Sequence, residues 1–501
     1  MGGVVLMSDV KGKGISRGSR SRKVRSIAMS DLKKRQIANQ YLDNLYMPEG
    51  KIRTNKKLWE VLPANIWKGR RVFIVGGGTS LRGFDFNKLK GEIVVTVNRT
   101  FEDYPDSVFN VCQDARLWGW YDGTEDNVTH KRIVEIPGGE EARMRFLSYK
   151  GYKVWLNVQA FPFPEDIYQV DILHPDDFSW KNPTLVAGIP PYGNSGLNAL
   201  NMVISLGARE IYLLGFDMYG EDGKTANYHA GYPASNSDEI YKNSFIPDFK
   251  DFASKIKGLN TKVINLNPKS ALKCFEFGNF KDIPKIARPI VVSFYTKNTG
   301  YQLEINRLEE SVRKFGLEYD FFASEDLGTW RKNIHARIQI LLNFLDKHAG
   351  KDIVYIDADG SVQKYPELLD NFQDDFGIVK IDHDKYWPAE RNRPTGRYEY
   401  LGGTMYLKNN DRMRALLRLW QKLDAPMNTP LSQHTLIRAI EQSSDLKIRI
   451  LPDTYCQIFD VMVEAGDPVV EHFQASRRSL HNIKINDKTG KIYVDFGGVQ
   501  H

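Results

Sequence analysis

The chain is poor in cysteine and has no long hydrophobic run. Its 501 residues include three cysteines, Cys112, Cys274 and Cys456, which lie far apart and form no CxxC pair. The sequence therefore indicates neither a disulfide framework nor a cysteine-based zinc site, and we expect a reducing, cytoplasmic setting. No stretch approaches the roughly 20 apolar residues that a membrane-spanning helix needs. The first residues, MGGVVLMSDV, also lack the basic segment and apolar core of a signal peptide, so we expect no membrane span.

Acidic residues are scarce at the start of the chain, where basic residues crowd together. The net charge of the whole chain is +7, and residues 1–36 account for roughly all of this excess. A segment rich in Gly, Ser and Arg is typical of a disordered, solvated arm; the alternative is an arm that binds nucleic acid or another polyanion. No aromatic residue stands between positions 11 and 36 to stack on bases, which favours a disordered tail. The basic residues are Lys11, Lys13, Arg17, Arg20, Arg22, Lys23, Arg25, Lys33, Lys34 and Arg35.

Strand-like and helix-like segments alternate along the rest of the chain. A chain of this length predicts two or three domains, and the alternation predicts an α/β fold with mixed or parallel sheets wrapped by helices. The Lys/Pro-punctuated stretch FKDIPKIARP, Phe280–Pro289, marks the boundary between two predicted units, residues 65–282 and 289–485. Predicted strands include Val72–Val75, Glu92–Thr100, Ser107–Cys112, Lys153–Asn157, Glu210–Leu214, Thr261–Leu266, Ile290–Tyr295, Glu318–Phe322, Gly377–Ile381, Gly403–Leu407 and Ile448–Leu451. Predicted helices include Asn198–Leu206, Gln302–Phe315, Asn333–His348, Asp411–Leu423 and Thr435–Glu441.

The most informative motif is DIVYIDADG at Asp352–Gly360. Its apolar run ends in Asp357 and Asp359, and side chains two residues apart on a strand point to the same face. Two carboxylates that leave a strand end together suit a hard divalent cation that also holds substrate phosphates. The alternative is a simple turn, in which Asp359-Gly360 closes the strand.

Two further features of the second unit favour the metal site. The segment YLGGTMYL, Tyr400–Leu407, places Gly402 and Gly403 just before a strand, where glycine lets the backbone approach a ligand closely. The segment VEHFQAS places His472 after an apolar strand, where an imidazole could complete a metal shell. A structural or surface histidine is the alternative for His472.

Taken in order, these motifs resemble those of the GT-A fold glycosyltransferases, which use nucleotide-diphospho-sugars. The resemblance covers roughly residues 289–485 and begins with a strand and nucleotide loop at Ile290–Thr296. It implies that Asp357 contacts the ribose or the metal, and that Asp359 and His472 bind Mn²⁺ or Mg²⁺ bridging the diphosphate. The ion would act as a Lewis acid and neutralise the departing nucleoside diphosphate, which makes Asp359 a catalytic candidate. Gly402 and Gly403 would approach the nucleotide-sugar.

One departure from this family pattern concerns the helix start at Ser432-Gln433, where these enzymes often have Asp-Gln. The identity of a catalytic base, and retention or inversion at the sugar, therefore remain open. Four basic residues are candidate phosphate partners, although each also fits an ordinary surface charge. They are Lys332, Arg337, Arg391 and Arg393.

The first unit has a glycine-rich segment of its own, GGGTSL at Gly76–Leu81, directly after an apolar strand. Backbone N–H groups in such a segment can hold a phosphate. The spacing is not a dinucleotide fingerprint, which would need glycine at Leu81, and no Gly-Lys-Ser/Thr follows as a P-loop requires. A structural tight turn is the alternative.

The wider pattern of residues 70–280 resembles the bacterial sialyltransferases with a single Rossmann-like domain, and related phage and surface-glycan proteins. The resemblance rests on the Gly76–Leu81 loop, on YGNSGLNALNMVISLGAREIYLLGFDMYG and on NYHAGYP. It implies a nucleotide-binding loop and a late catalytic base, His229, with Tyr219 and Tyr228 as phosphate partners. Asp114 stands where those enzymes carry Asn, and Asn194 where they carry Thr, so specificity for cytidine remains open. The implied nucleotide-sugar-binding positions are Gly76, Gly78, Ser80, Asn98, Asp114, Ser195 and Gly196.

The leading hypothesis is a two-unit, metal-assisted glycosyltransferase, with a second nucleotide-sugar site in the first unit left open. Its partners would be a nucleotide-sugar donor and an acceptor that is a surface glycan, a virion protein or a modified DNA base; a phage-encoded chain would act in the host cytoplasm. One alternative is a metal-dependent phosphohydrolase or nucleotidyltransferase, although the sequence lacks the extra acidic cluster of two-metal sites. Another is a nucleic-acid-binding protein that uses its basic tail.

Overall fold

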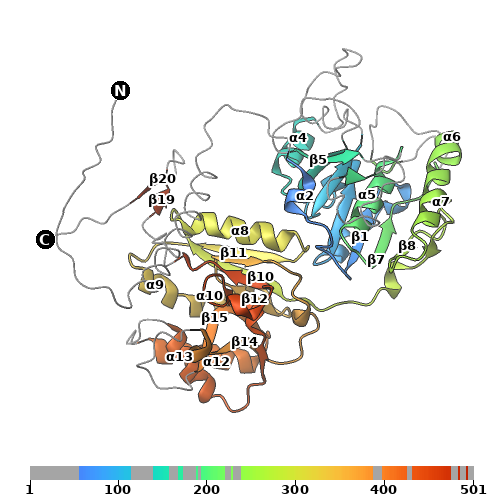
Figure 1. The fold of residues 1–501 in the computed structure, drawn as a ribbon. Coiled ribbons are helices and arrows are strands. Elements are labelled where there is room, and N and C mark those ends of the chain that lie inside the picture. The colour runs from blue at the N-terminus through green and yellow to red at the C-terminus, as the bar shows by residue number, and fades with distance from the viewer. Residues whose placement is uncertain are drawn as a thin grey trace, which may run out of the picture. The chain divides into compact units, whose positions relative to one another are not determined.

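The computed structural model describes residues 56–113, 139–156, 167–172, 188–189, 193–220, 227–229, 238–386, 398–425, 432–475, 483–485 and 492–494. These residues form an α/β fold with two main sheets (Figure 1), which confirms the fold class predicted from the sequence. None of the described helices combines the length and the hydropathy that a membrane crossing requires. The predicted basic tail, residues 1–36, lies outside the described residues.

The first sheet is parallel throughout its described pairings and has the strand order β6-β5-β4-β3-β2-β1-β7-β8-β9. Its central strands are continuous apolar runs because both faces of the sheet are buried. The chain order reverses between β1 and β7, and ligands of open α/β sheets bind at the carboxyl ends beside such a reversal. The strands are β1 (Arg71–Val75), β2 (Ile93–Val97), β3 (Phe109–Cys112), β4 (Tyr152–Leu156), β5 (Ile167–Ile172), β6 (Gly188–Ile189), β7 (Glu210–Leu214), β8 (Lys262–Asn265) and β9 (Glu276–Phe277).

The helix α5 (Ser195–Ser205) packs against β1, β2 and β3. Its first turn is capped by Asn194, whose side-chain oxygen accepts the Leu197 N–H at 3.0 Å. The helix therefore begins three residues before the predicted start, at a cap that the apolar periodicity does not show. The other described helices of this half are α2 (Leu58–Val61), α4 (Gly139–Ser148), α6 (Asp238–Ile240) and α7 (Ile246–Lys255).

The second sheet is mixed, with the strand order β11-β10-β12-β15-β14-β16. Strands β10, β11 and β12 are parallel to one another, whereas β15 runs antiparallel to both β12 and β14. The strands are β10 (Ile290–Thr296), β11 (Tyr319–Ser324), β12 (Ile353–Ile356), β14 (Phe376–Asp382), β15 (Tyr398–Leu407) and β16 (Ile448–Leu451). The helices are α8 (Tyr301–Arg313), α9 (Trp330–His335), α10 (Arg337–Lys347), α11 (His383–Tyr386), α12 (Asp411–Asp424) and α13 (Ser432–Glu441).

A small sheet of β13 (Gly360–Val362), β18 (Val470–His472) and β17 (Gln457–Ile458) lies beyond the end of β12. In its register Gly360 is paired with His472. This pairing brings the residue after the Asp357/Asp359 turn next to a residue more than 100 positions further along the chain. A separate antiparallel pair is formed by β19 (Ile483–Ile485) and β20 (Ile492–Val494).

Two predicted elements differ from the structure. The strand β12 ends at Ile356, so Asp357 and Asp359 lie in a turn that the Gly360 N–H closes on the Asp357 carbonyl oxygen at 2.8 Å; the expectation that they share one strand face is wrong. The predicted helix Asn333–His348 is two helices, α9 and α10, separated at Ala336. Thr329 caps α9, and the side chains of His335 and Arg337, on either side of Ala336, contact different partners.

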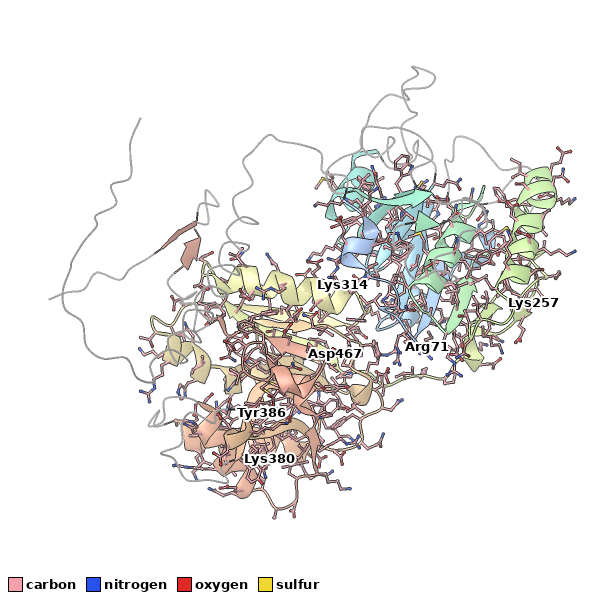
Figure 2. The ribbon with its side chains drawn as sticks, in the orientation of Figure 1. Arg71, Lys257, Lys314, Lys380, Tyr386 and Asp467 are labelled. Atoms are coloured by element: carbon pink, nitrogen blue, oxygen red, sulfur yellow. The ribbon has the colours of Figure 1, made fainter. Side chains whose placement is uncertain are left out.

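The two main sheets belong to one compact unit, Asn55–His501. One continuous hydrophobic cluster includes Val72 and Phe109 from the first sheet and Val291 and Phe315 from the second half. Around this cluster the Trp67 indole N–H donates to the carbonyl oxygen of Lys314, a residue labelled in Figure 2, at 2.7 Å.

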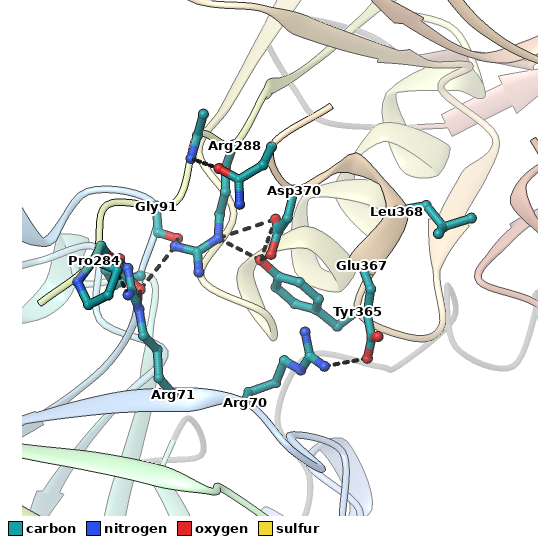
Figure 3. A network of polar contacts seen from close by, with 12 residues as sticks. Arg70, Arg71, Gly91, Pro284, Arg288, Tyr365, Glu367, Leu368 and Asp370 are labelled. Atoms are coloured by element: carbon teal, nitrogen blue, oxygen red, sulfur yellow. Dashed lines mark hydrogen bonds and ion pairs between the residues drawn. The ribbon is translucent and has the colours of Figure 1, made fainter. Parts of the chain in front are cut away.

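An arginine network joins the same two stretches of chain (Figure 3). Arg288 donates to the Gly91 carbonyl oxygen at 2.8 Å and to the Tyr365 hydroxyl at 2.6 Å, and it forms an ion pair with Glu92 at 2.9 Å. The Tyr365 hydroxyl donates in turn to Asp370 at 3.0 Å. Burial opposes the charge on Arg288, but Tyr365, Glu92 and Asp370 outweigh it and raise the pKa of the guanidinium, so this cation stays charged between the two halves.

Candidate functional site

The Asp357/Asp359 turn and the strand β18 bring two carboxylates and an imidazole together. Ligand atoms of Asp357, Asp359 and His472 all lie within 4.8 Å of one another. The backbone fixes Asp359 on both sides: its carbonyl oxygen accepts the Phe473 N–H at 3.0 Å, and its carboxylate accepts the Ala475 N–H at 2.6 Å. Two carboxylates and one imidazole form a donor set suited to Mn²⁺ or Mg²⁺, so the residues present fit such an ion.

His472 is almost fully buried, and both of its ring nitrogens face polar groups. Its Nε2 is hydrogen-bonded to the Thr404 hydroxyl at 2.9 Å, and its Nδ1 faces Asp359 at 3.8 Å. Burial alone would lower the pKa of His472, but the neighbouring Cys456 and Asp359 raise it well above its usual value. A divalent cation would compete with that proton, because a ligating imidazole must be neutral.

Asp357 is held by residues on both sides while part of its carboxylate faces solvent. The Tyr355 hydroxyl donates to its Oδ1 at 2.5 Å, and the Arg337 guanidinium lies 3.6 Å from the same oxygen. The side chain of Asp357 remains 38% exposed, against 10% for Arg337. Burial raises the pKa of Asp357, Arg337 opposes this, and the Asp359 carboxylate adds to it, so that the net pKa lies above its usual value. The electrostatics favour a positive charge between the two carboxylates.

The glycines of β15 lie in an irregular part of the strand. The register of β14 and β15 shifts between Ile378 and Val379, so that Gly402, Gly403 and Thr404 have no partner on β14. The Gly403 carbonyl oxygen accepts the Asp357 N–H at 2.8 Å. A Cβ at Gly403 would lie 3.0 Å from the His472 ring and 3.1 Å from the Cys456 sulfur. The missing side chain at Gly403 therefore lets the His472 ring pack against the strand.

Of the other predicted contacts in this half, Arg337 and Gln433 reach the site. Arg337 donates to the Gly402 carbonyl oxygen at 3.2 Å and to the Ser432 hydroxyl at 2.9 Å. The Gln433 side-chain oxygen accepts the Gly402 N–H at 3.2 Å. Lys332 lies away from this cluster, at a cavity formed by α9 and α12. Arg391 and Arg393 lie outside the described residues.

In the first half, the predicted phosphate loop surrounds a carboxylate of its own chain. Asp217, which is 2% exposed, accepts the Ser80 N–H at 2.8 Å and the Ser80 hydroxyl at 2.5 Å. Asn267 donates to the same carboxylate at 2.7 Å. A Cβ at Gly78 would lie 2.6 Å from Asp217, and one at Gly76 would lie 2.8 Å from the Gly215 carbonyl oxygen. The glycines thus allow the ends of β1 and β7 to approach, and the Ser80 donors are engaged within the chain.

His229 lies beside this loop and has a carboxylate partner. Its Nε2 is 2.7 Å from Asp103, whose carboxylate also accepts the Tyr228 hydroxyl at 2.6 Å. The Tyr228 N–H donates to the Gly77 carbonyl oxygen at 3.0 Å. Burial opposes the charge of Asp103, but His229 and Tyr228 outweigh it and lower its pKa. The Nδ1 of His229 is buried with no hydrogen-bond partner among the described residues.

The remaining predicted positions of the first half lie at the carboxyl ends of neighbouring strands. Asn98 follows β2 with a positive φ of 57°. Ser195 opens α5 and accepts the Gln113 N–H at 3.1 Å, and a Cβ at Gly196 would lie 2.7 Å from the Phe216 ring. Tyr219 is half-buried after β7. Asp114 lies outside the described residues.

Sequence reasoning missed several residues that contact these sites, among them Asp103, Asp217, Tyr355, Thr404 and Cys456. Asp217 has a signal that could have found it, because GFDMYG directly follows β7, and the carboxyl ends of adjacent parallel strands meet at one edge. Cys456 and Thr404 had no such signal, since their position beside His472 depends on the pairing of β13 with β18.

The class of the protein is α/β, and its similarities to known proteins lie among solved structures. No protein-family model and no curated protein matches the chain. One similar solved structure is a glycosyltransferase involved in the glycosylation of the major capsid of PBCV-1, with 17% identity over 37% of this chain and 93% of that chain and a TM-score of 0.30. A second is the galactosyltransferase LgtC in complex with donor and acceptor sugar analogues, with 12% identity over 37% of this chain and 86% of that chain and a TM-score of 0.26. A third is the glycosyltransferase GlyE of Streptococcus pneumoniae TIGR4, with 14% identity over 37% of this chain and 55% of that chain and a TM-score of 0.25. These identities and TM-scores do not assign the chain to a family.

Proposed function

We propose that the chain transfers a sugar from a nucleotide-sugar donor, and that the second half does so with a divalent cation. The observation that carries this proposal is the group of Asp357, Asp359 and His472, whose ligand atoms lie within 4.8 Å of one another. Mn²⁺ or Mg²⁺ held there would supply Lewis-acid neutralisation of the departing diphosphate. A divalent ion that uses few protein ligands keeps open positions for phosphate oxygens.

The chain's own residues have separate roles in this proposal. Asp359 and His472, fixed by backbone N–H groups and by Thr404, hold the ion in place. Asp357 contacts the ion or the ribose through its exposed oxygen. Arg337, 3.6 Å from Asp357, provides positive charge at the edge where diphosphate charge increases. Gly402 and Gly403 would border the donor, and the space that Gly403 leaves is taken by the His472 ring and Cys456.

The competing function is hydrolysis of a nucleotide at the same carboxylates. Two-metal phosphohydrolases use a second acidic cluster, and within the described ranges the Asp357 group is the one set of three or more possible ligands that meets. A single ion suits neutralisation of a leaving diphosphate. With a UDP- or GDP-sugar, nucleoside monophosphate together with sugar 1-phosphate would favour the hydrolase, whereas nucleoside diphosphate with a transferred or released sugar would favour the transferase.

The first test removes the carboxylates of the proposed metal site. Asp357→Asn and Asp359→Asn should each reduce Mn²⁺-dependent turnover of UDP- or GDP-sugars at least about 100-fold, since each deletes charge that the ion needs. Turnover by the wild-type chain should also stop in EDTA and return with Mn²⁺. Release of nucleotide, followed by chromatography, measures both effects.

Asp467, labelled in Figure 2, provides the matched control, because its carboxylate is 84% exposed and does not belong to the proposed site. Its partner is Lys364, at an N–O distance of 2.9 Å. Asp467→Asn should keep wild-type turnover. Full activity in the Asp357→Asn/Asp359→Asn double variant would exclude the metal site.

We also propose a second nucleotide-sugar site in the first half, with His229 as its base. The support is the pairing of His229 with Asp103 at 2.7 Å, which orients the ring. Gly76, Gly78, Ser80, Asn98, Asp114, Ser195 and Gly196 would bind the donor. The Asp217 carboxylate, which engages Ser80, would have to release that residue before it contacted phosphate.

His229→Ala tests this second site. It should abolish turnover of CMP-sugars and leave the Mn²⁺-dependent activity within about twofold, because no described contact links His229 to Asp357. Tyr241→Phe is a suitable control in the same half, since Tyr241 packs on Phe245 through its ring. Loss of both activities in His229→Ala would contradict independent sites.

A further inference from the structure

A buried histidine–carboxylate pair lies next to the proposed transferase site without belonging to it. The Nδ1 of His335, at the end of α9, is hydrogen-bonded to the carboxylate of Asp424, at the end of α12. The Thr435 hydroxyl of α13 donates to the other oxygen of Asp424 at 2.5 Å. The side chains of His335 and Asp424 are 3% and 4% exposed. Three helices are thus joined at one buried carboxylate.

A contribution to the stability of the fold does not by itself explain the buried His335–Asp424 pair. Burial of an imidazole and a carboxylate costs desolvation free energy, and well-packed apolar residues often replace such pairs without loss. The Nε2 of His335 is also buried with no hydrogen-bond partner among the described residues, which adds the cost of an unsatisfied polar atom. A role in fixing one arrangement of the helices explains the pair better than a contribution to the free energy of unfolding.

Hydrogen bonds lead from the pair to the transferase site through the first turn of α13. The Trp420 indole donates to the Ser432 carbonyl oxygen at 2.9 Å and to Thr435 at 3.1 Å. The Ser432 hydroxyl accepts from Arg337 at 2.9 Å, and Arg337 lies 3.6 Å from Asp357. The next residue, Gln433, accepts the Gly402 N–H at 3.2 Å. The start of α13 is therefore held from one side by Asp424 and in turn holds Arg337 and the Gly402 backbone.

His335 and Arg337 flank Ala336, where α9 and α10 meet, and contact α12 and α13 at different points. The backbone at Ala336 keeps helical dihedral angles, and its N–H donates to the Lys332 carbonyl oxygen at 3.1 Å. Side chains two positions apart on a helix point about 200° apart around its axis, which agrees with the different partners of His335 and Arg337.

We propose that His335 and Asp424 are positioning residues of the sugar-transfer site: they fix the first turn of α13, and so place Ser432 against Arg337 and Gln433 against Gly402. This inference depends on the proposed function, since it assigns the pair to the site that holds Asp357. Neither residue touches the proposed ion or the donor.

A cavity of about 370 Å³ beside the pair provides a direct experiment. His335 and Asp424 line it, together with Lys332, Ile338 and Gln421. Free imidazole in this cavity can replace the side chain that His335→Ala removes, provided that the Asp424 carboxylate is present to accept its N–H. We expect His335→Ala and Asp424→Asn to lower kcat roughly 10- to 100-fold with a smaller change in KM for the donor. Millimolar imidazole should restore His335→Ala and leave Asp424→Asn unchanged.

His348→Ala is the matched control. His348 lies just beyond the other end of α10, and its Nε2 pairs with Asp320 at 2.7 Å, but no described hydrogen bond joins it to α13. This variant should keep the wild-type kcat. A lower melting temperature in His335→Ala with an unchanged kcat, or equal restoration of both variants by imidazole, would overturn the proposal.

A measurement that does not depend on catalytic turnover distinguishes this inference from the proposed function. The Trp420 indole N–H resonance, assigned with Trp420→Phe in ¹⁵N-tryptophan-labelled protein, reports its hydrogen bond to Ser432. It should shift in His335→Ala and return with imidazole. If the Trp420 resonance does not move in His335→Ala, the positioning role is contradicted. If the resonance moves and imidazole restores it, but the separate Asp357→Asn variant keeps full turnover, only the proposed function is contradicted.

Discussion

At the residue scale, the proposed metal site depends on the absence of a side chain at Gly403. A Cβ there would lie within 3.0 Å of the His472 ring and 3.1 Å of Cys456, both buried, so neither neighbour can move freely. At Gly402 the nearest atoms are the Arg337 guanidinium nitrogens at 3.4 Å, an ordinary contact with a long side chain. The two adjacent glycines therefore differ in what they tolerate.

We predict that Gly403→Ala weakens Mn²⁺ binding roughly 10- to 100-fold by displacing the His472 ring. Gly402→Ala should weaken it less than about threefold. Electron paramagnetic resonance titration of free Mn²⁺ measures both affinities without requiring a substrate. Equal affinities for the two variants would show that His472 is not held by Gly403.

Single residues also show how far the sequence could predict the site. Asp357, Asp359, Gly403 and His472 can be selected from motifs, because each follows or precedes an apolar strand, and the structure brings them together. The turn that carries both carboxylates could not be predicted, since the strand ends at Ile356 and the turn is stabilised by pairing with β18. Long-range register sets that geometry, and a local pattern does not encode it.

At the scale of elements, Asp375, the residue before β14, forms hydrogen bonds to the start of α12 and to the residue before β16. Its buried carboxylate accepts Arg412 Nε at 2.8 Å, the Lys447 N–H at 3.1 Å and the Asn410 side chain at 2.6 Å. Arg412 and Asn410 belong to the start of α12, and Lys447 precedes β16. Burial opposes ionisation, but these hydrogen bonds outweigh it and lower the pKa of Asp375 to about 2.

We predict that Asp375→Asn lowers the free energy of unfolding at pH 7 by on the order of 2 kcal/mol. Because the folded pKa lies below the unfolded value of about 3.9, the stabilisation is present above pH 5 and is lost as the pH falls towards 2. The difference between wild type and variant should shrink over that range in denaturant titrations. Asp374→Asn, next in sequence and paired with Arg449, should cost less than about 1 kcal/mol; a pH-independent difference for Asp375→Asn would contradict the assignment.

The elements themselves were largely predictable where the apolar runs are continuous. The structure has β1, β7 and β10 close to the predicted ranges, because buried parallel strands consist mostly of apolar residues. The division of Asn333–His348 into α9 and α10 was not predictable, since Ala336 favours helix and its backbone keeps helical dihedral angles. Short strands such as β9 and β13 were missed because two or three residues carry no periodic signal.

At the scale of the whole molecule, Arg288 connects the two halves of the chain. It contacts Gly91 and Glu92 from the first half and Tyr365 and Asp370 from the second (Figure 3). Its side chain is 12% exposed and that of Glu92 is 11% exposed. Removal of the guanidinium would take the ion pair from Asp370, whose side chain is 18% exposed, whereas Glu92 would keep its ion pair with Arg71.

We predict that Arg288→Met destabilises the chain by roughly 3–5 kcal/mol, measured as a lower midpoint of chemical unfolding. Lys364→Met removes a cation from an exposed pair with Asp467 and should change the midpoint little. A midpoint for Arg288→Met equal to that of Lys364→Met would show that the network does not hold the halves together.

The Asp217 carboxylate gives the glycine loop of the first half a built-in counter-ligand. A phosphate that bound at Ser80 would be repelled by the Asp217 carboxylate and would have to displace it from the Ser80 donors. A ligand that carries compensating positive charge, or that presents an uncharged group to Ser80, would avoid this repulsion. In the second site that we propose, this carboxylate would select against free phosphate and in favour of a ligand that presents an uncharged group to Ser80.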